Sequence, residues 1–387
     1  MIRPEPSELQ ELVRDWHQQA RPWCPAGLGS RLHWGPPLQG GDVISTANLN
    51  RIIEHSAGDF TVTVEAGMPL AQLQAELAST NQWLAVDPPW GSGNTGSVGG
   101  LVARGLSGGL RQRYLGLRDQ LIGIEVLRAD GTRSRAGGRV VKNVAGYDLM
   151  RLLCGSWGSL GLITAVTLRT YPRQAHRAGL LLEGDLAALE QLRRACLAAP
   201  LMPQRLDWLT PALVGSEQTG LLLSLVSISQ GALEAQLSDL LSEAFSAGLS
   251  ATKLEPDALQ ALEATAQGAD QLEQDLWLLH LGVPPAAAQT LLQESALQHL
   301  HCALAAGCGQ GWAWGPAKQA PVFAIAALRE RCQQLGGQLT VLCQPTSVSG
   351  RLPAWRDSPA RSVIEAIKRD FDPLQQLSRG RLPGVQA

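Results

Sequence analysis

A glycine-rich stretch constrains this chain more than any other feature. Residues 88–109 read PPWGSGNTGSVGGLVARGLSGG, with eight glycines, and the literal pattern G-x-G-x-x-G begins at Gly91. A Rossmann dinucleotide site needs a strand ending at the first glycine and a helix starting by the third. The two prolines that open the stretch cannot continue a central strand, and the glycines that follow disfavour a helix. The stretch therefore predicts a loop of another geometry and argues against an NAD site.

A second glycine loop, PAGLGSRLHWG, covers residues 25–35. Small residues let a backbone approach a ligand closely, and successive N–H groups can then bind a pyrophosphate. Two such loops could clamp one long ligand from two sides. The alternative is that both are ordinary surface turns, because turns also collect glycine.

Composition narrows the class of protein. The chain has 387 residues, 45% hydrophobic and 17% charged, with a net charge of −2 and no basic tract, which disfavours nucleic-acid binding. No run of 18 uncharged apolar residues predicts a membrane span, and residues 6–19 predict an amphipathic helix instead of a signal segment. Seven cysteines without a C-x-x-C favour reduced thiols in a cytoplasmic protein over disulfides or an iron–sulfur site.

The first part of the chain alternates strand-like and helix-like segments. Its predicted strands are Asp42–Thr46, Thr61–Gly67, Leu121–Gly131 and Leu160–Pro172. Its predicted helices are Ala47–Gly58 and Met68–Asn81.

From about residue 173 the pattern changes to long helices between short strands, in an order β-α-β-β-α that occurs twice. The first set is Gly179–Gly184, a helix to Leu197, Arg205–Leu209, Gly220–Ile228 and the helix Ala232–Phe245. The second is Leu276–Pro284, the helix Ala287–Leu297, Cys302–Gly307, Gly311–Gly315, the helix Val322–Leu335 and Gln338–Pro345. We expect two ferredoxin-like repeats, or one antiparallel sheet covered by helices. A last helix and loop complete an α+β chain.

Four segments carry a family resemblance: PAGLGS, VEAGMPLAQLQAEL, DPPWGSGNTGSVGGLVARGLSGG and RVVKNVAGYDLMRLLCGSWGSLGLITAVTLRTYP. Their order and spacing over residues 20–172 resemble the FAD-binding domain of the vanillyl-alcohol-oxidase/PCMH flavoprotein superfamily. VKNVAGYDLMRL…GSWGSLGLIT and the FDP…LSRGRLPG tail are similar to the GlcE subunits of glycolate oxidase (glycolate dehydrogenase). The resemblance is weaker over 173–355. It implies a PCMH-type FAD-binding domain of two α/β subdomains in 1–172, a cap domain in 173–355, and a helix and tail in 356–387 that return to the FAD domain.

The resemblance also implies cofactor contacts along the two glycine loops and at the start of the last strand of the first domain. Because the first loop carries Cys24 and Ala26 but no histidine up to Ser30, we expect non-covalent FAD. The implied FAD-binding residues are Ala26, Gly27, Leu28, Gly29, Ser30, Pro88, Pro89, Gly93, Asn94, Thr95, Gly96, Ser97, Gly99, Gly100, Ser107, Gly108, Gly161 and Ile163.

Catalytic residues are left unassigned. Oxidation of an α-hydroxy acid needs a cation for the carboxylate and a base for the hydroxyl proton. The candidate carboxylate binders are arginines beside the glycine loop. A second set of polar residues, over 142–148, either contacts the flavin or forms a structural network that braces the domain. His299 and His301 form an H-x-H that could share a strand face or diverge at a helix end, and no metal site is predicted. The candidates are Arg104, Arg111 and Arg113, and then Lys142, Asn143, Tyr147 and Asp148.

Three functions stay open on the sequence. The resemblance implies an FAD-binding subunit of a glycolate oxidase complex, in which glycolate is oxidised to glyoxylate and electrons pass to a second flavoprotein subunit and an iron–sulfur subunit. Such a complex could place the chain at the periphery of a membrane. The alternatives are a stand-alone FAD-dependent 2-hydroxy-acid dehydrogenase and a flavin-free scaffold of the same fold.

Overall fold

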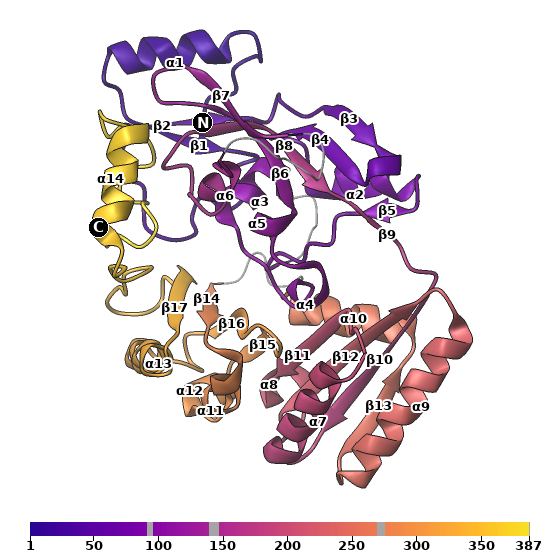
Figure 1. Cartoon of the computed structure of the whole chain (residues 1–387). Coiled ribbons are helices and arrows are strands. Elements are labelled where there is room, and N and C mark those ends of the chain that lie inside the picture. The colour runs from indigo at the N-terminus through magenta and orange to yellow at the C-terminus, as the bar shows by residue number, and fades with distance from the viewer. Residues whose placement is uncertain (91–95, 139–146, 269–274, 387) are drawn as a thin grey trace.

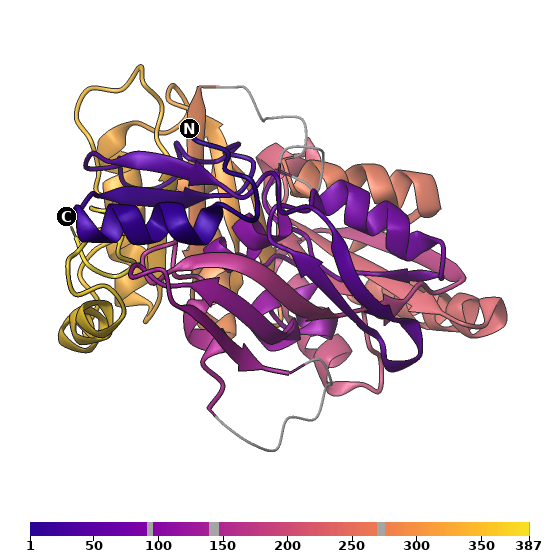
Figure 2. The same cartoon turned by 90° about the horizontal axis from the view of Figure 1, so that it is seen from above.

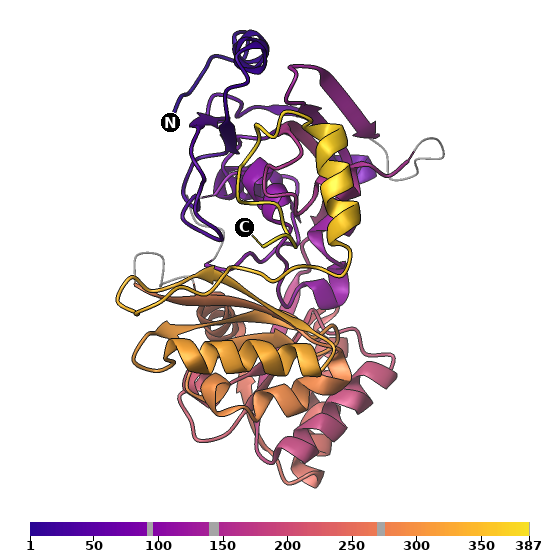
Figure 3. The ribbon, with the colours of Figure 1, turned by 90° about the vertical axis from the view of Figure 1, so that its left-hand side faces the viewer.

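The computed structural model describes residues 1–90, 96–138, 147–268 and 275–386. Two sheet-based bodies lie one above the other (Figure 1). The upper body contains the first part of the chain, and the lower body is built on one large sheet. Helix α14 (Arg361–Phe371) brings the end of the described chain back beside the upper body (Figures 1 and 3).

A parallel strand pair and one amphipathic helix begin the upper body. Strand β1 (Trp23–Ala26) pairs with β2 (Asp42–Ser45), and α1 (Leu9–Gln18) lies over them (Figure 2). Helix α1 buries Leu9, Val13 and Trp16, whose spacing forms one helical face. These side chains pack with residues of β1 and β2 in one small core.

The upper body is completed by a five-stranded antiparallel sheet in the order β3-β4-β8-β6-β7. Its strands are β3 (Ile52–Ser56), β4 (Thr61–Glu65), β8 (Leu162–Arg169), β6 (Leu121–Leu127) and β7 (Arg133–Gly137). The predicted helix Ala47–Gly58 is wrong, because this segment forms β3 and a 3₁₀ turn, Ala57–Asp59. Its two isoleucines favour extended backbone, and the pairing of Ile52 and of Glu54–Ser56 with β4 outweighs the helical spacing.

Short helices and a two-stranded ribbon surround this sheet. The predicted helix Met68–Asn81 is confirmed as α2 (Leu70–Ala78). The other elements are β5 (Gln82–Trp83) and β9 (Tyr171–Pro172), which pair, and α3 (Val98–Arg104), α4 (Arg111–Tyr114), α5 (Leu117–Gln120) and α6 (Met150–Leu153). The expectation that glycines exclude a helix from residues 88–109 is wrong, because α3 forms there. The cap by Ser97 and the burial of Leu101 and Val102 outweigh the cost of its two glycines.

The lower body contains an eight-stranded antiparallel sheet in the order β13-β10-β12-β11-β15-β16-β14-β17. Each half has the strand order of a ferredoxin-like unit, and the halves join where β11 pairs with β15. Both expectations for this region are therefore met in one sheet, and the α+β class is confirmed. The strands are β10 (His176–Glu183), β11 (Arg205–Leu209), β12 (Gly220–Ser227), β13 (Ser250–Leu254), β14 (Leu276–Gly282), β15 (His301–Ala305), β16 (Gln310–Pro316) and β17 (Gln338–Cys343).

Most helices of the lower body cover the face of the sheet that points away from the upper body (Figure 3). They are α7 (Leu186–Ala198), α9 (Gln230–Ser246), η2 (Pro285–Ala287), α11 (Ala288–Leu292), α12 (Ser295–Gln298) and α13 (Val322–Gln334); α8 (Pro211–Val214) lies beside β15. The predicted helix Ala287–Leu297 is thus divided into α11 and α12. Helix α10 (Pro256–Ala266) packs on the opposite face. The sequence pattern predicted neither α10 nor β13.

The face toward the upper body carries indole rings. Trp312 and Trp314 of β16 point to this side and pack with Trp34 and Trp90 of the upper body. Leu209 and Leu222 share this apolar layer, while their strand neighbours Trp208 and Leu221 face the other core, as strand alternation requires. The two bodies are therefore joined by a continuous apolar core.

Helix α14 and the segment after it bind to the upper body. Buried Lys368 donates hydrogen bonds to the carbonyls of Ser159 (2.8 Å) and Leu377 (2.9 Å). We retain the division 1–172, 173–355 and 356–387 as a proposal. Within the described parts of the chain, no helix combines the length and apolar character needed to cross a bilayer.

Candidate cofactor site

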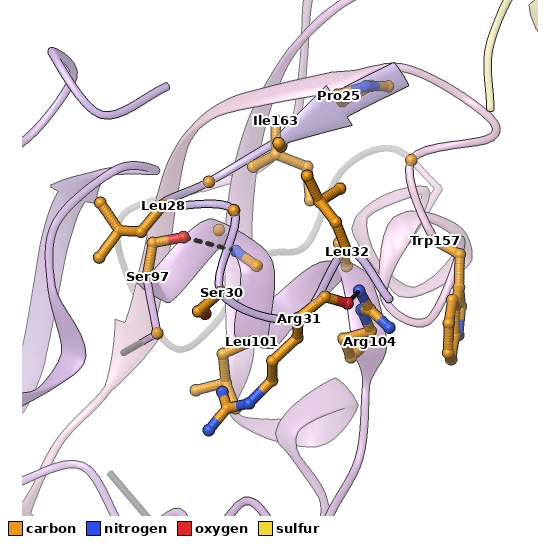
Figure 4. Close-up of a pocket in the computed structure, with 18 of the residues that line it drawn as sticks. Pro25, Leu28, Ser30, Arg31, Leu32, Ser97, Leu101, Arg104, Trp157 and Ile163 are labelled. Atoms are coloured by element: carbon orange, nitrogen blue, oxygen red, sulfur yellow. Dashed lines mark hydrogen bonds between the residues drawn. The ribbon is translucent and has the colours of Figure 1, made fainter. Parts of the chain in front are cut away.

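A cleft lies where the loop after β1 faces the start of α3 and the start of β8 (Figure 4). It encloses about 920 Å³ of space that protein atoms do not fill, part of which is open to solvent. Its walls come from both glycine-rich loops, from Trp157–Ile163, and from one residue of the last segment, Arg381.

The loop Gly27–Ser30 presents unused backbone donors to this cleft. Among the residues that the structure describes, the four N–H groups of this loop donate no hydrogen bond. Gly29 has φ +82°, a left-handed conformation that turns the chain, and the N–H of Leu32 closes the turn on the carbonyl of Gly29. Successive free N–H groups around such a turn form an anion-binding concavity.

Two glycines allow the walls of the cleft to approach each other. A Cβ at Gly27 would lie 1.9 Å from Oγ of Ser97, and a Cβ at Gly99 would lie 2.5 Å from Cβ of Ala66. Ser97 caps α3, since its Oγ accepts a hydrogen bond from the N–H of Gly100 at 3.1 Å. A side chain at position 27 would thus disturb both the loop and the helix cap.

Three arginines give the cleft positive charge: Arg31, Arg104 and Arg381. Arg104 donates to the carbonyl of Arg31, and its guanidinium lies 4.1 Å from the ring centre of Trp157 (Figure 4). Its Nη1 is buried without a hydrogen-bond partner. Burial, followed by the charges of Arg381 and Arg31, lowers the pKa of Arg104 to about 9. The cleft is therefore prepared for an anion.

Many of the FAD-binding residues implied by the resemblance line the cleft, together with the candidate carboxylate binder Arg104. Those that do are Ala26, Gly27, Leu28, Gly29, Ser30, Pro88, Pro89, Gly96, Ser97, Gly99, Gly100, Arg104, Gly161 and Ile163. Five predicted positions lie outside the described residues, namely Gly93, Asn94, Thr95, Lys142 and Asn143.

Ser107 and Gly108 are not among the residues that line the cleft. Oγ of Ser107 accepts a hydrogen bond from the N–H of Leu117 at 3.2 Å. The N–H of Gly108 donates to Oδ1 of Asp87 at 3.0 Å, and a Cβ there would lie 2.4 Å from the ring of Trp312. In this structure Gly108 therefore serves contact between the two bodies.

Other candidates also lie away from the cleft lining. Arg113 donates to the carbonyl of Met202 at 2.9 Å, and the side chain of Tyr147 is 88% exposed. Arg111 approaches the lower body, where its charge adds to burial in lowering the pKa of His280 to about 4. His299 follows directly after α12 and His301 begins β15, so the two histidines lie at the ends of different elements.

Sequence reasoning missed a buried ion network between the bodies. Asp87 accepts the N–H groups of Gly108 (3.0 Å) and Leu110 (3.1 Å), and it also pairs with Arg205. Arg205 donates to Oδ2 of Asp207 at 3.0 Å, and its Nε lies 4.0 Å from Oε1 of Glu263. The alternation in RLDWL puts Arg205 and Asp207 on one strand face, which is a signal that the sequence did offer.

Comparisons with known proteins agree with this geometry. A family model described as an FAD binding domain matches residues 4–137. The glycolate oxidase subunit GlcE of Escherichia coli is 33% identical over 184 residues, 48% of this chain and 51% of the relative. The glycolate oxidase subunit GlcD of Bacillus subtilis is 33% identical over 205 residues, 52% of this chain and 43% of the relative.

Two further likenesses extend the comparison. A probable mitochondrial D-lactate dehydrogenase of Danio rerio is 37% identical over 168 residues, covering 42% of this chain and 33% of that protein. The solved structure of an alkyldihydroxyacetonephosphate synthase superposes with a TM-score of 0.69 at 14% identity, over 97% of this chain and 75% of that one. The chain spans between a third and about half the length of these curated relatives.

Over residues 4–137 the chain matches an FAD-binding domain, in agreement with the PCMH-type domain that the sequence predicts. Its cofactor is FAD. The residues present fit that group, because four free N–H groups and a buried, unpartnered guanidinium nitrogen suit a diphosphate.

Proposed function

We propose that this chain is the FAD-binding component of an enzyme that oxidises a 2-hydroxy acid, with glycolate as the first candidate, and passes the electrons to partner subunits. The observation that carries the proposal is the cleft with four free N–H groups at Gly27–Ser30. Similarity to two proteins described as glycolate oxidase subunits supports the substrate class and a multi-subunit assembly. The proposal also includes the two partners that the family resemblance implies, a second flavoprotein subunit and an iron–sulfur subunit. It further includes a cytoplasmic location.

The residues of the cleft would hold the cofactor through its charged part. In this proposal the N–H groups of Gly27–Ser30 bind the diphosphate, and the glycines of α3 let its first turn approach. FAD, when bound, supplies the two-electron acceptor. The arginines would keep that region positive, and the indole of Trp157 would hold the guanidinium of Arg104 in place.

Attachment of FAD is proposed to be non-covalent. Cys24 lines the cleft, and burial raises the pKa of its thiol, so the nucleophilic thiolate is disfavoured. The nearest following histidine, His33, borders a different hollow. Acid precipitation should therefore release the flavin into the supernatant, and a flavin that stays with the pellet would contradict this expectation.

The direct test is to purify the tagged chain from its native extract and to measure flavin absorbance and iron in the eluate. The isolated protein and any co-purified complex are then mixed anaerobically with glycolate, D-lactate and L-lactate. We expect flavin in both samples and bleaching at about 450 nm with glycolate in the complex. Flavin without partner chains or iron would count against the subunit assignment.

A second candidate is a stand-alone D-2-hydroxy-acid dehydrogenase. The likeness to a protein described as a probable D-lactate dehydrogenase favours it. Turnover by the isolated chain with an artificial electron acceptor and D-lactate would establish this alternative. A colourless protein that cannot be reconstituted with FAD would instead indicate a flavin-free scaffold.

A further inference from the structure

The segment 372–382, which we call the tail, reaches the cofactor cleft from far along the sequence. Its Arg381 lines the cleft with a side chain only 3% exposed. Nη2 of Arg381 donates to the carbonyl of Leu32, whereas Nε is buried without a hydrogen-bond partner. A buried guanidinium with an unused donor is costly unless an acceptor is supplied.

Arg381 adds to charge that the cleft already holds. Arg31, Arg104 and Arg381 line it, and no carboxylate does so within the described ranges. Burial first, and then the mutual effect of these cations, lowers the pKa of Arg104. Burial also lowers the pKa of Arg381. Bringing three cations together in one cleft is therefore unfavourable in itself, and an anion would offset this cost.

The geometry places this charge beside the free N–H groups. Arg104 donates to the carbonyl of Arg31, and Arg381 donates to that of Leu32. These carbonyls lie one and two residues beyond the loop Gly27–Ser30. An anion seated on the N–H groups of that loop would thus have two anchored guanidinium groups close by.

The tail is attached to the strand that leads into this loop. The N–H of Trp23 donates to the carbonyl of Gln376, and the N–H of Ser378 donates to the carbonyl of Trp23, both at 2.9 Å. Oγ of Ser378 donates to the carbonyl of Gly158 at 3.1 Å. Arg381 is therefore positioned by a segment that pairs with β1 itself.

We propose that Arg381 is a ligand of the FAD diphosphate, acting with Arg104, and that docking of the tail is coupled to binding of FAD. This inference rests on the proposed use of FAD. The diphosphate carries the permanent negative charge of FAD, and Arg matches phosphate oxygens through two donors. FAD binding and tail docking then stabilise each other, as linked equilibria require.

The test compares Arg381→Gln with Arg379→Gln in the full chain. Arg379 lies in the same tail but is exposed, so its loss is the matched control. Apo protein is titrated with FAD, ADP and riboflavin. We expect Arg381→Gln to weaken FAD and ADP binding at least about tenfold and to leave riboflavin binding within about twofold of the wild type. Arg379→Gln should bind FAD and ADP within about twofold of the wild type.

Thermal unfolding separates a ligand role from a structural one. Glutamine is shorter than arginine and gives up the hydrogen bond to the carbonyl of Leu32, but it also removes one of three like charges. These two changes oppose each other in the apo protein, so the melting temperature of apo Arg381→Gln should stay close to that of the wild type, while the increase produced by FAD becomes smaller. Arg381→Lys should recover part of that increase. Equal loss of stability in the apo and FAD-bound forms would overturn the proposal.

Hydrogen exchange tests the coupling. FAD should slow amide exchange of residues 372–382 in the wild type and much less in Arg381→Gln. Wild-type FAD affinity in Arg381→Gln, or weaker FAD binding with unchanged ADP binding, would overturn the diphosphate assignment. Failure of the proposed function would appear differently, because the wild type itself would then bind no FAD.

Discussion

The two ends of one glycine-rich stretch meet different surroundings. Gly96–Gly100 borders the cofactor cleft, where Gly99 approaches Ala66 and nearby donors lack protein acceptors. Gly108 and Gly109 instead reach the lower body, where a Cβ at Gly109 would lie 2.2 Å from Oδ2 of Asp207. The first end leaves room for a ligand, and the second is filled by protein. A high density of glycines thus indicates only that the backbone approaches something closely. The surrounding tertiary structure shows whether that is a ligand site or another domain.

This difference should separate binding from stability. Several hydrogen-bond donors at the cleft have no protein acceptor and would need a bound anion, so substitutions there should change mainly FAD affinity. Polar groups around Asp87 have protein partners across the two bodies, so substitutions there should change mainly unfolding. The following expectations run from the largest effect to the smallest.

Asp87→Ala should lower the free energy of unfolding by about 3–5 kcal/mol, because it removes a buried carboxylate and leaves Arg205 with fewer partners. The measurement is urea denaturation followed by far-UV circular dichroism. Asp239→Ala is the control, since Asp239 is exposed on α9. A variant that unfolds like the wild type yet loses FAD would break the contrast between the two ends.

Gly27→Ala should weaken FAD binding at least about tenfold, because the new Cβ would collide with Ser97, which caps α3. Flavin per chain after purification and an FAD titration measure the effect. Gly58→Ala is the matched control, since a Cβ at Gly58 would meet nothing within 4 Å. Unchanged FAD affinity together with lost stability would show that Gly27, like Gly108 and Gly109, serves packing between protein segments instead.

Asp207→Asn should alter the pH dependence of stability. Burial raises the pKa of Asp207 to about 6 from 3.8, so the folded chain binds a proton there that the unfolded chain releases. The contribution of Asp207 is therefore full below about pH 4 and is lost as pH rises through 6, at no more than about 1.4 kcal/mol per pH unit.

Unfolding midpoints of wild type and Asp207→Asn, measured from pH 4 to pH 7.5, check this sign. The wild type should lose stability relative to the variant as pH rises across that interval. Asp257→Asn, an exposed substitution on α10, should follow the wild type. Parallel curves for wild type and Asp207→Asn would show that Asp207 keeps its ordinary pKa in the fold.

Tyr147→Ser should have the smallest effect. Its side chain is 88% exposed, and such substitutions change unfolding by about 0.5 kcal/mol or less. FAD affinity should stay within about twofold. A loss of FAD affinity beyond about threefold would instead support Tyr147 as a flavin contact, the role that the family resemblance left open. Tyr147 would then belong to the cofactor site as well.

Local patterns predicted much of the fold because burial imposes them residue by residue. Alternation located strands such as Arg205–Leu209, and helical spacing located α2 and α13. The same rule failed at Ala47–Gly58, where the pairing of β3 with β4 decided the outcome. It also missed β13, a mostly exposed edge strand with little apolar pattern.

The candidate site was predicted where its residues are adjacent in sequence. Gly27–Ser30 and Gly96–Gly100 were found because glycine and small polar residues cluster there. Arg381 carries no such local signal, because its position in the cleft depends on pairing of the tail with β1. Sequence alone also could not show that Gly108 packs against Trp312 of the lower body.

The family resemblance implied FAD as the cofactor. Residue types and short-range spacing were enough to predict the α+β character and two loops that allow close backbone approach. They suffice for these features because they act through local sterics and burial. The packing of the whole chain decided which glycines border the cleft, which meet the lower body, and which distant charges lie beside them. Those outcomes depend on contacts such as Asp87 with Arg205 and Arg381 with Leu32, which form only when remote segments pack together.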